Sequence, residues 1–119
     1  MPDSNDKLDQ LRHQIRSFVA ERDWQQFHTP KNLACALSVE AAELLEPFQW
    51  LATGKKEELN AATQKAIRHE VADVFVYLTM LADSLEIDLF EAATEKMQLN
   101  ALKYPAPVVR VDARKYTDY

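Results

Sequence analysis

Two acidic pairs inside apolar, helix-favouring segments constrain this chain more than any other feature. They are Glu40-x-x-Glu43 and Glu70-x-x-Asp73. On a helix, residues three apart lie about 60° from each other, so both carboxylates of a pair share one face beside the apolar stripe. Four ionised carboxylates next to a core are unfavourable unless a cation neutralises them. The sequence therefore predicts a site for a hard divalent metal held by oxygen ligands.

A single glycine, Gly54, in 119 residues indicates an all-α fold, because the helix-favouring residues Ala, Leu, Glu and Lys are plentiful. At this length we expect one domain that covers residues 1–119. The single Cys35 cannot form an internal disulfide, and its apolar neighbours predict a small buried side chain in a reducing, cytoplasmic setting.

Charge and hydropathy exclude several classes of protein. The net charge of −5 argues against a nucleic-acid-binding surface, and no basic run is interleaved with aromatics. The segment 33–51 is apolar, but three central glutamates disfavour its insertion into a membrane. The first residues lack the basic and apolar blocks of a signal peptide. We therefore expect neither a membrane nor a nucleic-acid partner.

Helical periodicity predicts a small four-helix bundle followed by a tail. Thr29 is the expected N-cap of the second helix, with Pro30 at its first position, and Asp88 with Glu91 has the form of a capping box for the fourth. Pro47 predicts a kink, because proline has no N–H to donate to the preceding turn. If the second and third helices run antiparallel, the two acidic pairs meet. The expected helices are 6–22, 30 to about 54, 61–84 and 88–103, and residues 105–119 are expected as an extended tail or an arm on a partner subunit.

Taken alone, an acidic pair on a helix is more often a solvated face than a site. Among metal chemistries, a di-iron bundle needs Glu-x-x-His pairs, which neither segment has. A zinc protease helix reads His-Glu-x-x-His, whereas the segment that begins at His69 ends in Asp73. An all-carboxylate site favours Mg²⁺ or Mn²⁺, so His69 is not included among the ligands.

Motifs spread over nearly the whole chain resemble those of the MazG-like nucleotide pyrophosphohydrolases, within the all-α NTP pyrophosphatase superfamily. The resemblance is closest to the dCTP pyrophosphatase branch. Some relatives place a histidine on the first helix where this chain has Ile15, so that contact is not expected here. The motifs that carry the resemblance are Glu21–His28, Pro30-x-Asn32-Leu33, Glu40-x-x-Glu43-Leu44 with Phe48-Gln49-Trp50, Glu70-x-x-Asp73-Val74-x-x-Tyr77-Leu78, Lys96-Met97-x-x-Asn100-x-x-Lys103-Tyr104-Pro105 and Arg114–Thr117.

The resemblance implies hydrolysis of a nucleoside triphosphate, such as dCTP or a modified dCTP, to the monophosphate and pyrophosphate. It implies Mg²⁺, with Mn²⁺ as the other candidate, held by Glu40, Glu43, Glu70 and Asp73. Aromatic and polar groups after the first helix would bind the base, an aromatic after the second acidic pair would contact the sugar, and the end of the fourth helix would meet the phosphates. The expected substrate-binding residues are Trp24, Gln25, Gln26, Phe27, His28, Trp50, Tyr77, Lys96, Asn100, Lys103 and Tyr104.

Two further expectations concern assembly and the competing function. Val39, Leu45, Phe75 and Phe90 fall outside the apolar stripes, and a monomer that exposes them together would carry a large apolar patch. The resemblance points to a dimer of dimers, so a homotetramer is expected, with the base pocket at a subunit boundary. The alternative is a non-catalytic helical bundle whose acidic face binds divalent cations or a basic protein.

Overall fold

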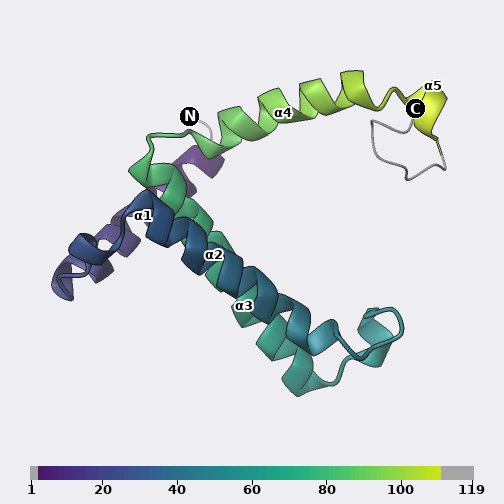
Figure 1. Cartoon of the computed structure of the whole chain (residues 1–119), viewed down its shortest axis with the longest axis horizontal. Helices are drawn as coiled ribbons and strands as arrows, with labels where there is room; N and C mark the ends of the chain where they lie inside the picture. Colours follow the sequence, from purple (N-terminus) through teal and green to yellow (C-terminus); the bar gives the residue numbers. More distant parts are fainter. Residues whose placement is uncertain (1–2, 111–119) are drawn as a thin grey trace. The chain divides into compact units, whose positions relative to one another are not determined.

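The computed structural model describes residues 3–110, within which all regular structure is helical. The predicted all-α class is thereby confirmed. The chain divides into two compact units, Met1–Glu86 and Ile87–Tyr119. Figure 1 labels the helices of both units along the sequence. None of the described helices is long and apolar enough to cross a membrane.

The first unit is built on a pair of antiparallel helices. Helix α2 (Pro30–Leu45) packs along α3 (Ala61–Ser84), while α1 (Asp3–Glu21) contacts α3 more sparsely (Figure 1). The predicted pairing of the second and third helices is therefore confirmed. Few side chains in the described part are buried, and they are Leu8, Val19, Leu33, Thr79 and Ala82.

Polar caps set where the long helices begin. The Thr29 side chain accepts a hydrogen bond from the backbone N–H of Asn32 (3.2 Å), with Pro30 at the first helical position as predicted. The Asn60 side chain accepts one from the N–H of Thr63 (2.8 Å), so α3 spans the predicted 61–84. Each cap satisfies an N–H that the helix itself leaves unpaired.

The second helix ends earlier than predicted. We expected it to kink at Pro47 and continue to about Gly54, but α2 stops at Leu45 and a 3₁₀ turn, η2 (Glu46–Phe48), follows. Because Pro47 has no N–H for the carbonyl of Glu43, the ladder of i→i−4 hydrogen bonds stops there instead of bending. The change of helix type shortens the rigid part of the helix but leaves the acidic pair on it.

A tight loop joins η2 to α3 and is closed by a glutamate. Glu58, in η3 (Lys56–Glu58), accepts hydrogen bonds from the N–H groups of Ala52 (3.0 Å), Thr53 (2.7 Å) and Gly54 (2.8 Å) and from the Thr53 hydroxyl (2.6 Å). Gly54 has φ +75°, in the left-handed region that side chains other than glycine rarely adopt. The loop is therefore ordered by one carboxylate and one glycine.

The second unit contains α4 (Leu89–Lys103) and the short α5 (Ala106–Val109). The Asp88 side chain accepts a hydrogen bond from the N–H of Glu91 (3.0 Å), which confirms the predicted cap. The extended tail is wrong for residues 106–109, because Pro105 and Pro107 hold φ at values that suit a first helical turn. The rest of the predicted tail, 111–119, lies outside the described residues.

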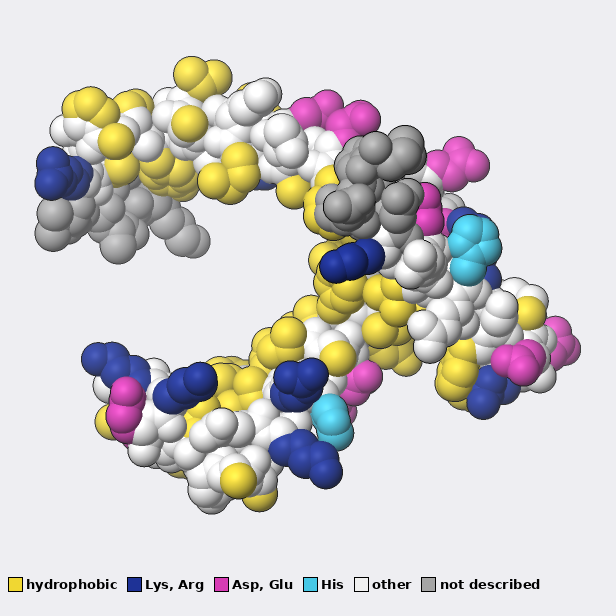
Figure 2. Space-filling view, turned by 180° about the vertical axis from the view of Figure 1, so that it is seen from behind, with side chains coloured by type: hydrophobic (Ala, Val, Ile, Leu, Met, Phe, Trp, Pro, Cys, Tyr) yellow, Lys and Arg dark blue, Asp and Glu magenta, His cyan; other side chains and the backbone are white. Residues whose placement is uncertain are grey.

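Several apolar side chains are exposed on the described chain. The predicted exposure of Val39, Leu45, Phe75 and Phe90 is confirmed, at 56%, 61%, 45% and 42%. Helix α4 has no buried residue, and hydrophobic side chains are visible along it in Figure 2. The predicted burial of Cys35 is wrong: its side chain is exposed, because it lies about 200° around α2 from the buried Leu33.

Candidate functional site

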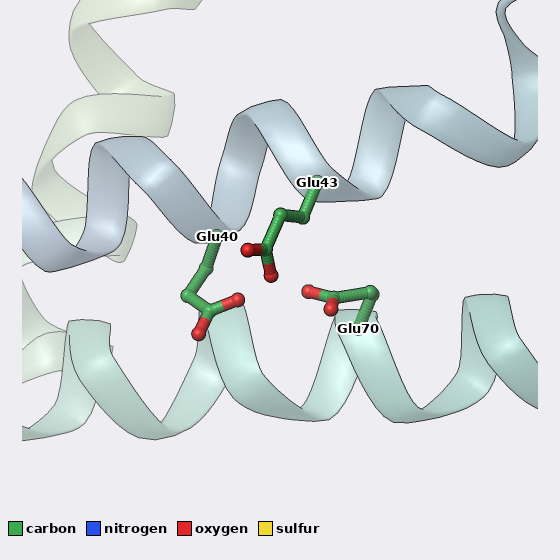
Figure 3. Close-up of side chains that lie close together, drawn as sticks. All are labelled: Glu40, Glu43 and Glu70. Atoms are coloured by element: carbon green, nitrogen blue, oxygen red, sulfur yellow. The ribbon is translucent and has the colours of Figure 1, made fainter.

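Three glutamates converge between α2 and α3. Glu40 and Glu43 project from α2 and Glu70 from α3, and Figure 3 shows the three carboxyl groups pointing toward one another. One carboxylate oxygen of each lies within 4.8 Å of the others. All three side chains are half-buried. The antiparallel pairing of two helices has therefore brought together acidic residues that lie far apart in the sequence.

Two oxygen atoms of the cluster are left without hydrogen bonds. The Oε2 atoms of Glu40 and Glu70 are buried and have no hydrogen-bond partner. Neither the ion pair of Arg12 with Asp9 nor that of Arg16 with Asp83 involves the cluster. Buried carboxylate oxygens without a donor are unfavourable, and a divalent cation satisfies them at the same time as it neutralises their charge.

Neighbouring carboxyls and burial raise the pKa of Glu40 and of Glu70. The pKa of Glu40 is raised to about 7, first by its hydrogen bond with the Glu43 carboxyl, and then by desolvation and by Glu70. The pKa of Glu70 is also raised, first by desolvation, with the charges of Glu43 and Asp73 adding to it, while the hydrogen bond with Glu40 acts in the opposite direction. Carboxylates that hold on to protons at neutral pH are those whose charge nothing nearby compensates.

Asp73, the fourth predicted ligand, is not among the converging carboxylates. It is exposed and lines a cavity of about 410 Å³ between α1 and α3. Asp73 lines this cavity with residues of α1, whereas the Glu70 carboxyl converges with two glutamates of α2. Asp73 still lies close enough to Glu70 for its charge to raise the pKa of that carboxyl.

The cavity beside Asp73 contains part of the predicted base pocket. Trp24, His28 and Tyr77 line it, together with the apolar side chains of α1. The indole of Trp24 meets the Phe18 ring edge-to-face at 5.8 Å and the His28 ring at 6.3 Å. The Nδ1 atom of His28 is buried and has no hydrogen-bond partner. The cavity is thus largely apolar, with a few polar groups at its edge, as small-molecule sites commonly are.

The other predicted base-binding residues lie elsewhere. Gln25 lines a neighbouring cavity, and the Gln26 side chain donates a hydrogen bond to the Asp23 carbonyl (3.1 Å). Phe27 is 59% exposed and Trp50 is 87% exposed, and neither lines the cavity beside Asp73 or the neighbouring one. Within one chain, the cavity beside Asp73 therefore brings together only Trp24, His28 and Tyr77 of the predicted base- and sugar-binding residues.

The predicted phosphate-binding residues belong to the second unit. Lys96, Asn100 and Lys103 follow one another at helical spacing along α4, and the N–H of Tyr104 donates to the Asn100 carbonyl (2.8 Å). Lys96 is exposed and Asn100 is half-buried. These residues share one side of α4.

The sequence reasoning missed the contribution of α1 to the cavity. Leu11, Ile15 and Phe18 recur at helical spacing in the first predicted helix, and they line the cavity together with the polar Gln14. Their spacing signals a buried face but does not show whether protein or ligand covers it. No sequence signal distinguishes these two cases.

Comparison with known proteins places these features in a family. A model of the MazG-like family matches residues 35–118. The human (Homo sapiens) dCTP pyrophosphatase 1 is 41% identical over 113 residues, which are 93% of this chain and 66% of that protein. Its counterpart from Bos taurus is 38% identical over 117 residues, 97% of this chain and 69% of that protein. The chain thus spans about two thirds of the length of these curated relatives.

A solved structure gives the same result for the fold. A pyrophosphatase from Archaeoglobus fulgidus superposes with a TM-score of 0.77 and 42% sequence identity. The match covers 83% of this chain and 93% of that one. At this identity the similarity extends to the sequence as well as the arrangement of helices.

Proposed function

The chain belongs to the MazG-like family, and from that membership we propose that it is a nucleotide pyrophosphohydrolase. It would convert a (deoxy)nucleoside triphosphate to the monophosphate and pyrophosphate, as part of removing unwanted nucleotides. The observation that carries the proposal is the convergence of Glu40, Glu43 and Glu70, with the Oε2 atoms of Glu40 and Glu70 buried and without a hydrogen-bond partner. The relatives named dCTP pyrophosphatase 1 support dCTP or a modified dCTP as the substrate.

Mg²⁺ is the proposed cation of the glutamate cluster, and Mn²⁺ its substitute. The donor set consists of carboxylate oxygens, which these hard cations prefer. We include Asp73 as a fourth ligand, because it lies one helical turn after Glu70 and its charge acts on that carboxyl. When bound, the metal would neutralise charge on the phosphates and lower the pKa of a bound water.

The proposed reaction breaks one phosphoanhydride bond. A water oxygen forms a bond to the α-phosphorus, the bond from that phosphorus to the bridging oxygen breaks, and pyrophosphate leaves with the bridging oxygen. One carboxylate of the cluster takes the proton of the attacking water as general base. We assign this role to Glu43, which projects between Glu40 and Glu70 (Figure 3).

The cavity lined by Trp24, His28 and Tyr77 is the proposed site for the base and the sugar. Its volume of about 410 Å³ suits a ligand of that size. The Trp24 indole offers a stacking surface, and the unpartnered Nδ1 of His28 offers a polar contact for the base edge. Trp24→Ala should therefore raise KM and weaken discrimination between bases, whereas changes in the glutamate cluster should act on kcat.

Residues of α4 are proposed to bind the phosphates. Lys96 and Lys103 supply positive charge, and Asn100 and Tyr104 supply hydrogen-bonding groups on the same helix end. A lysine at the end of a helix binds phosphate oxygens as a point charge. Lys96→Gln should raise KM for the triphosphate more than it changes kcat.

We propose a homotetramer, arranged as a dimer of dimers, as the working assembly. The exposed apolar side chains on α2, α3 and α4, among them Val39, Leu45, Phe75 and Phe90, support it, because a monomer rarely exposes so many. A partner subunit would also bring aromatic side chains to a base pocket that one chain leaves open. A monomeric mass by light scattering at micromolar concentration, with full activity, would contradict this assembly. A cytoplasmic setting stays a prediction that rests on the single Cys35.

Hydrolysis in ¹⁸O-labelled water tests the proposed reaction. With dCTP and Mg²⁺, phosphorus NMR should show monophosphate and pyrophosphate, with the label in the monophosphate, and EDTA should stop the reaction. Orthophosphate plus diphosphate would refute the assignment. A protein that binds Mn²⁺ but releases nothing from a panel of natural and modified nucleotides would support the alternative, a non-catalytic acidic bundle.

A further inference from the structure

An ion pair fastens α1 to α3. The Arg16 guanidinium on α1 donates from Nε to Oδ2 of Asp83 (2.9 Å) and from Nη2 to Oδ1 (2.5 Å). The two residues lie 67 positions apart in the sequence. Two parallel hydrogen bonds between a planar guanidinium and a carboxylate fix both the distance and the relative orientation of the groups. The contact thus restrains how α1 lies on α3.

Little else holds the two helices at this level. Of the described residues of α1, only Leu8 and Val19 are buried, and α1 contacts α3 much more sparsely than α2 does. Two hollows open between α1 and α3, the cavity of about 410 Å³ beside Asp73 and a second of about 400 Å³. Arg16 and Asp83 line the second hollow, and Ile15, Val19, His28 and Met80 line both. The ion pair therefore lines a hollow that shares wall residues with the proposed base site.

The end of α1 is hydrogen-bonded to a residue that lines the proposed base site. The N–H of Trp24 donates to the Val19 carbonyl (3.1 Å) and the N–H of Asp23 to the Ala20 carbonyl (3.1 Å). Asp23 has φ 54°, in the left-handed region common just after a helix end, and Trp24 lies two residues after Arg22, which begins the turn after α1 ends at Glu21. His28 comes at the end of the next 3₁₀ turn, Gln25–Phe27. Movement of α1 against α3 would therefore move Trp24 relative to Tyr77.

We propose that Arg16 and Asp83 are positioning residues, which hold α1 at the distance from α3 that lets Trp24 and Tyr77 line one substrate pocket. The inference rests on the proposed function for its kinetic consequence but not for its structural one. Asp83 is suited to the role, because its side chain is only 24% exposed and Arg16 is the first of the causes that lower its pKa. Neither residue touches the glutamate cluster, so the chemical step should be spared.

The kinetic test compares Asp83→Asn with Arg12→Gln. Asp83→Asn breaks the pair between α1 and α3 and should raise KM about fivefold, which corresponds to about 1 kcal/mol, with kcat nearly unchanged. Arg12→Gln removes a guanidinium from α1, the helix that carries Arg16, but Arg12 pairs with Asp9 inside α1. It should leave KM unchanged. The exchange Arg16→Asp with Asp83→Arg should restore much of the loss.

A second measurement does not depend on activity. The indole N–H resonance of Trp24 should shift in Asp83→Asn and return toward its original position in the exchanged pair. Trp50, which is 87% exposed and lies in another part of the unit, serves as the internal control. An unmoved Trp24 resonance, or an equal shift in Arg12→Gln, would overturn the positioning role. A wild-type protein without pyrophosphate release, but with a shifted Trp24 resonance in Asp83→Asn, would overturn the proposed function and leave the positioning contact standing.

Discussion

The glutamate cluster between α2 and α3 and Glu58 in the loop before α3 have opposite environments. In the cluster between α2 and α3, the carboxylates face one another, and the pKa of Glu40 is raised to about 7, first by its hydrogen bond with Glu43. In the loop before α3, Glu58 accepts four hydrogen bonds, and these lower its pKa to about 2, with the Thr53 hydroxyl as the largest cause. The Oε2 atoms of Glu40 and Glu70 have no hydrogen-bond partner, whereas the Glu58 carboxylate accepts four hydrogen bonds.

The difference separates a binding site from a structural contact. When the protein's own donors occupy a carboxylate, it has no oxygen lone pair left for a ligand. Replacing such a carboxylate loosens the local backbone. Carboxylates that repel one another lower the stability of the fold and persist where something else binds them. Replacing Glu58 should therefore change stability, and replacing a glutamate of the cluster should change catalytic activity.

The largest expected effect is on turnover. Glu43→Gln removes a carboxylate from the cluster and should reduce kcat by on the order of 100-fold or more. The melting temperature should stay the same or rise, because repulsion is relieved. Glu57→Gln is the matched control, since Glu57 is exposed outside the cluster. If the melting temperature of Glu43→Gln collapses together with the activity, the cluster is structural and the contrast with Glu58 fails.

A smaller effect is expected on stability when the loop glycine is replaced. A Cβ on Gly54 would lie 2.7 Å from Cδ1 of Phe48, at a φ of +75° that disfavours side chains. Gly54→Ala should therefore lower the free energy of unfolding by about 1 kcal/mol or more, measured from urea unfolding. Adding Phe48→Leu should recover part of this loss by removing ring atoms. An unchanged midpoint of urea unfolding in Gly54→Ala would show that the loop tolerates a side chain at this position.

The smallest effect is expected at Glu58 itself. Its folded-state pKa of about 2 lies below the ordinary 4.5, so its contribution to stability is complete above about pH 4.5 and is lost as the pH falls toward 2. In Glu58→Gln, the amides of Ala52, Thr53 and Gly54 should exchange hydrogen faster at neutral pH, while kcat stays close to that of the wild type. The variant should also lose the change in stability across that pH window. Wild-type exchange rates in Glu58→Gln would remove the basis of the comparison.

The sequence predicted the parts of the fold that depend on local chemistry. The caps at Thr29 and Asp88 were identified because their side chains bond to nearby N–H groups. The convergence of Glu40, Glu43 and Glu70 followed from helical spacing and an antiparallel pair. The early end of α2 was missed, because a proline allows either a kink or a stop, and packing decides between them.

The rest depended on contacts between distant residues. Asp73 was grouped with Glu70 by spacing alone, and only the place of α1 shows that Asp73 borders a second cavity. The position of α1 on α3 is fixed in part by the ion pair of Arg16 and Asp83, which no sequence motif predicts. The sequence predicts Trp50 in the base pocket, but its side chain is almost fully exposed in one chain.

Titration with Mn²⁺, followed by electron paramagnetic resonance, tests the central claim most directly. The wild type and Glu58→Gln should bind Mn²⁺ with similar affinity, Mg²⁺ should compete for the same site, and Glu43→Gln should bind at least tenfold more weakly, about 1.4 kcal/mol. Equal Mn²⁺ binding by the wild type and Glu43→Gln would show that the cluster between α2 and α3 is not the metal site.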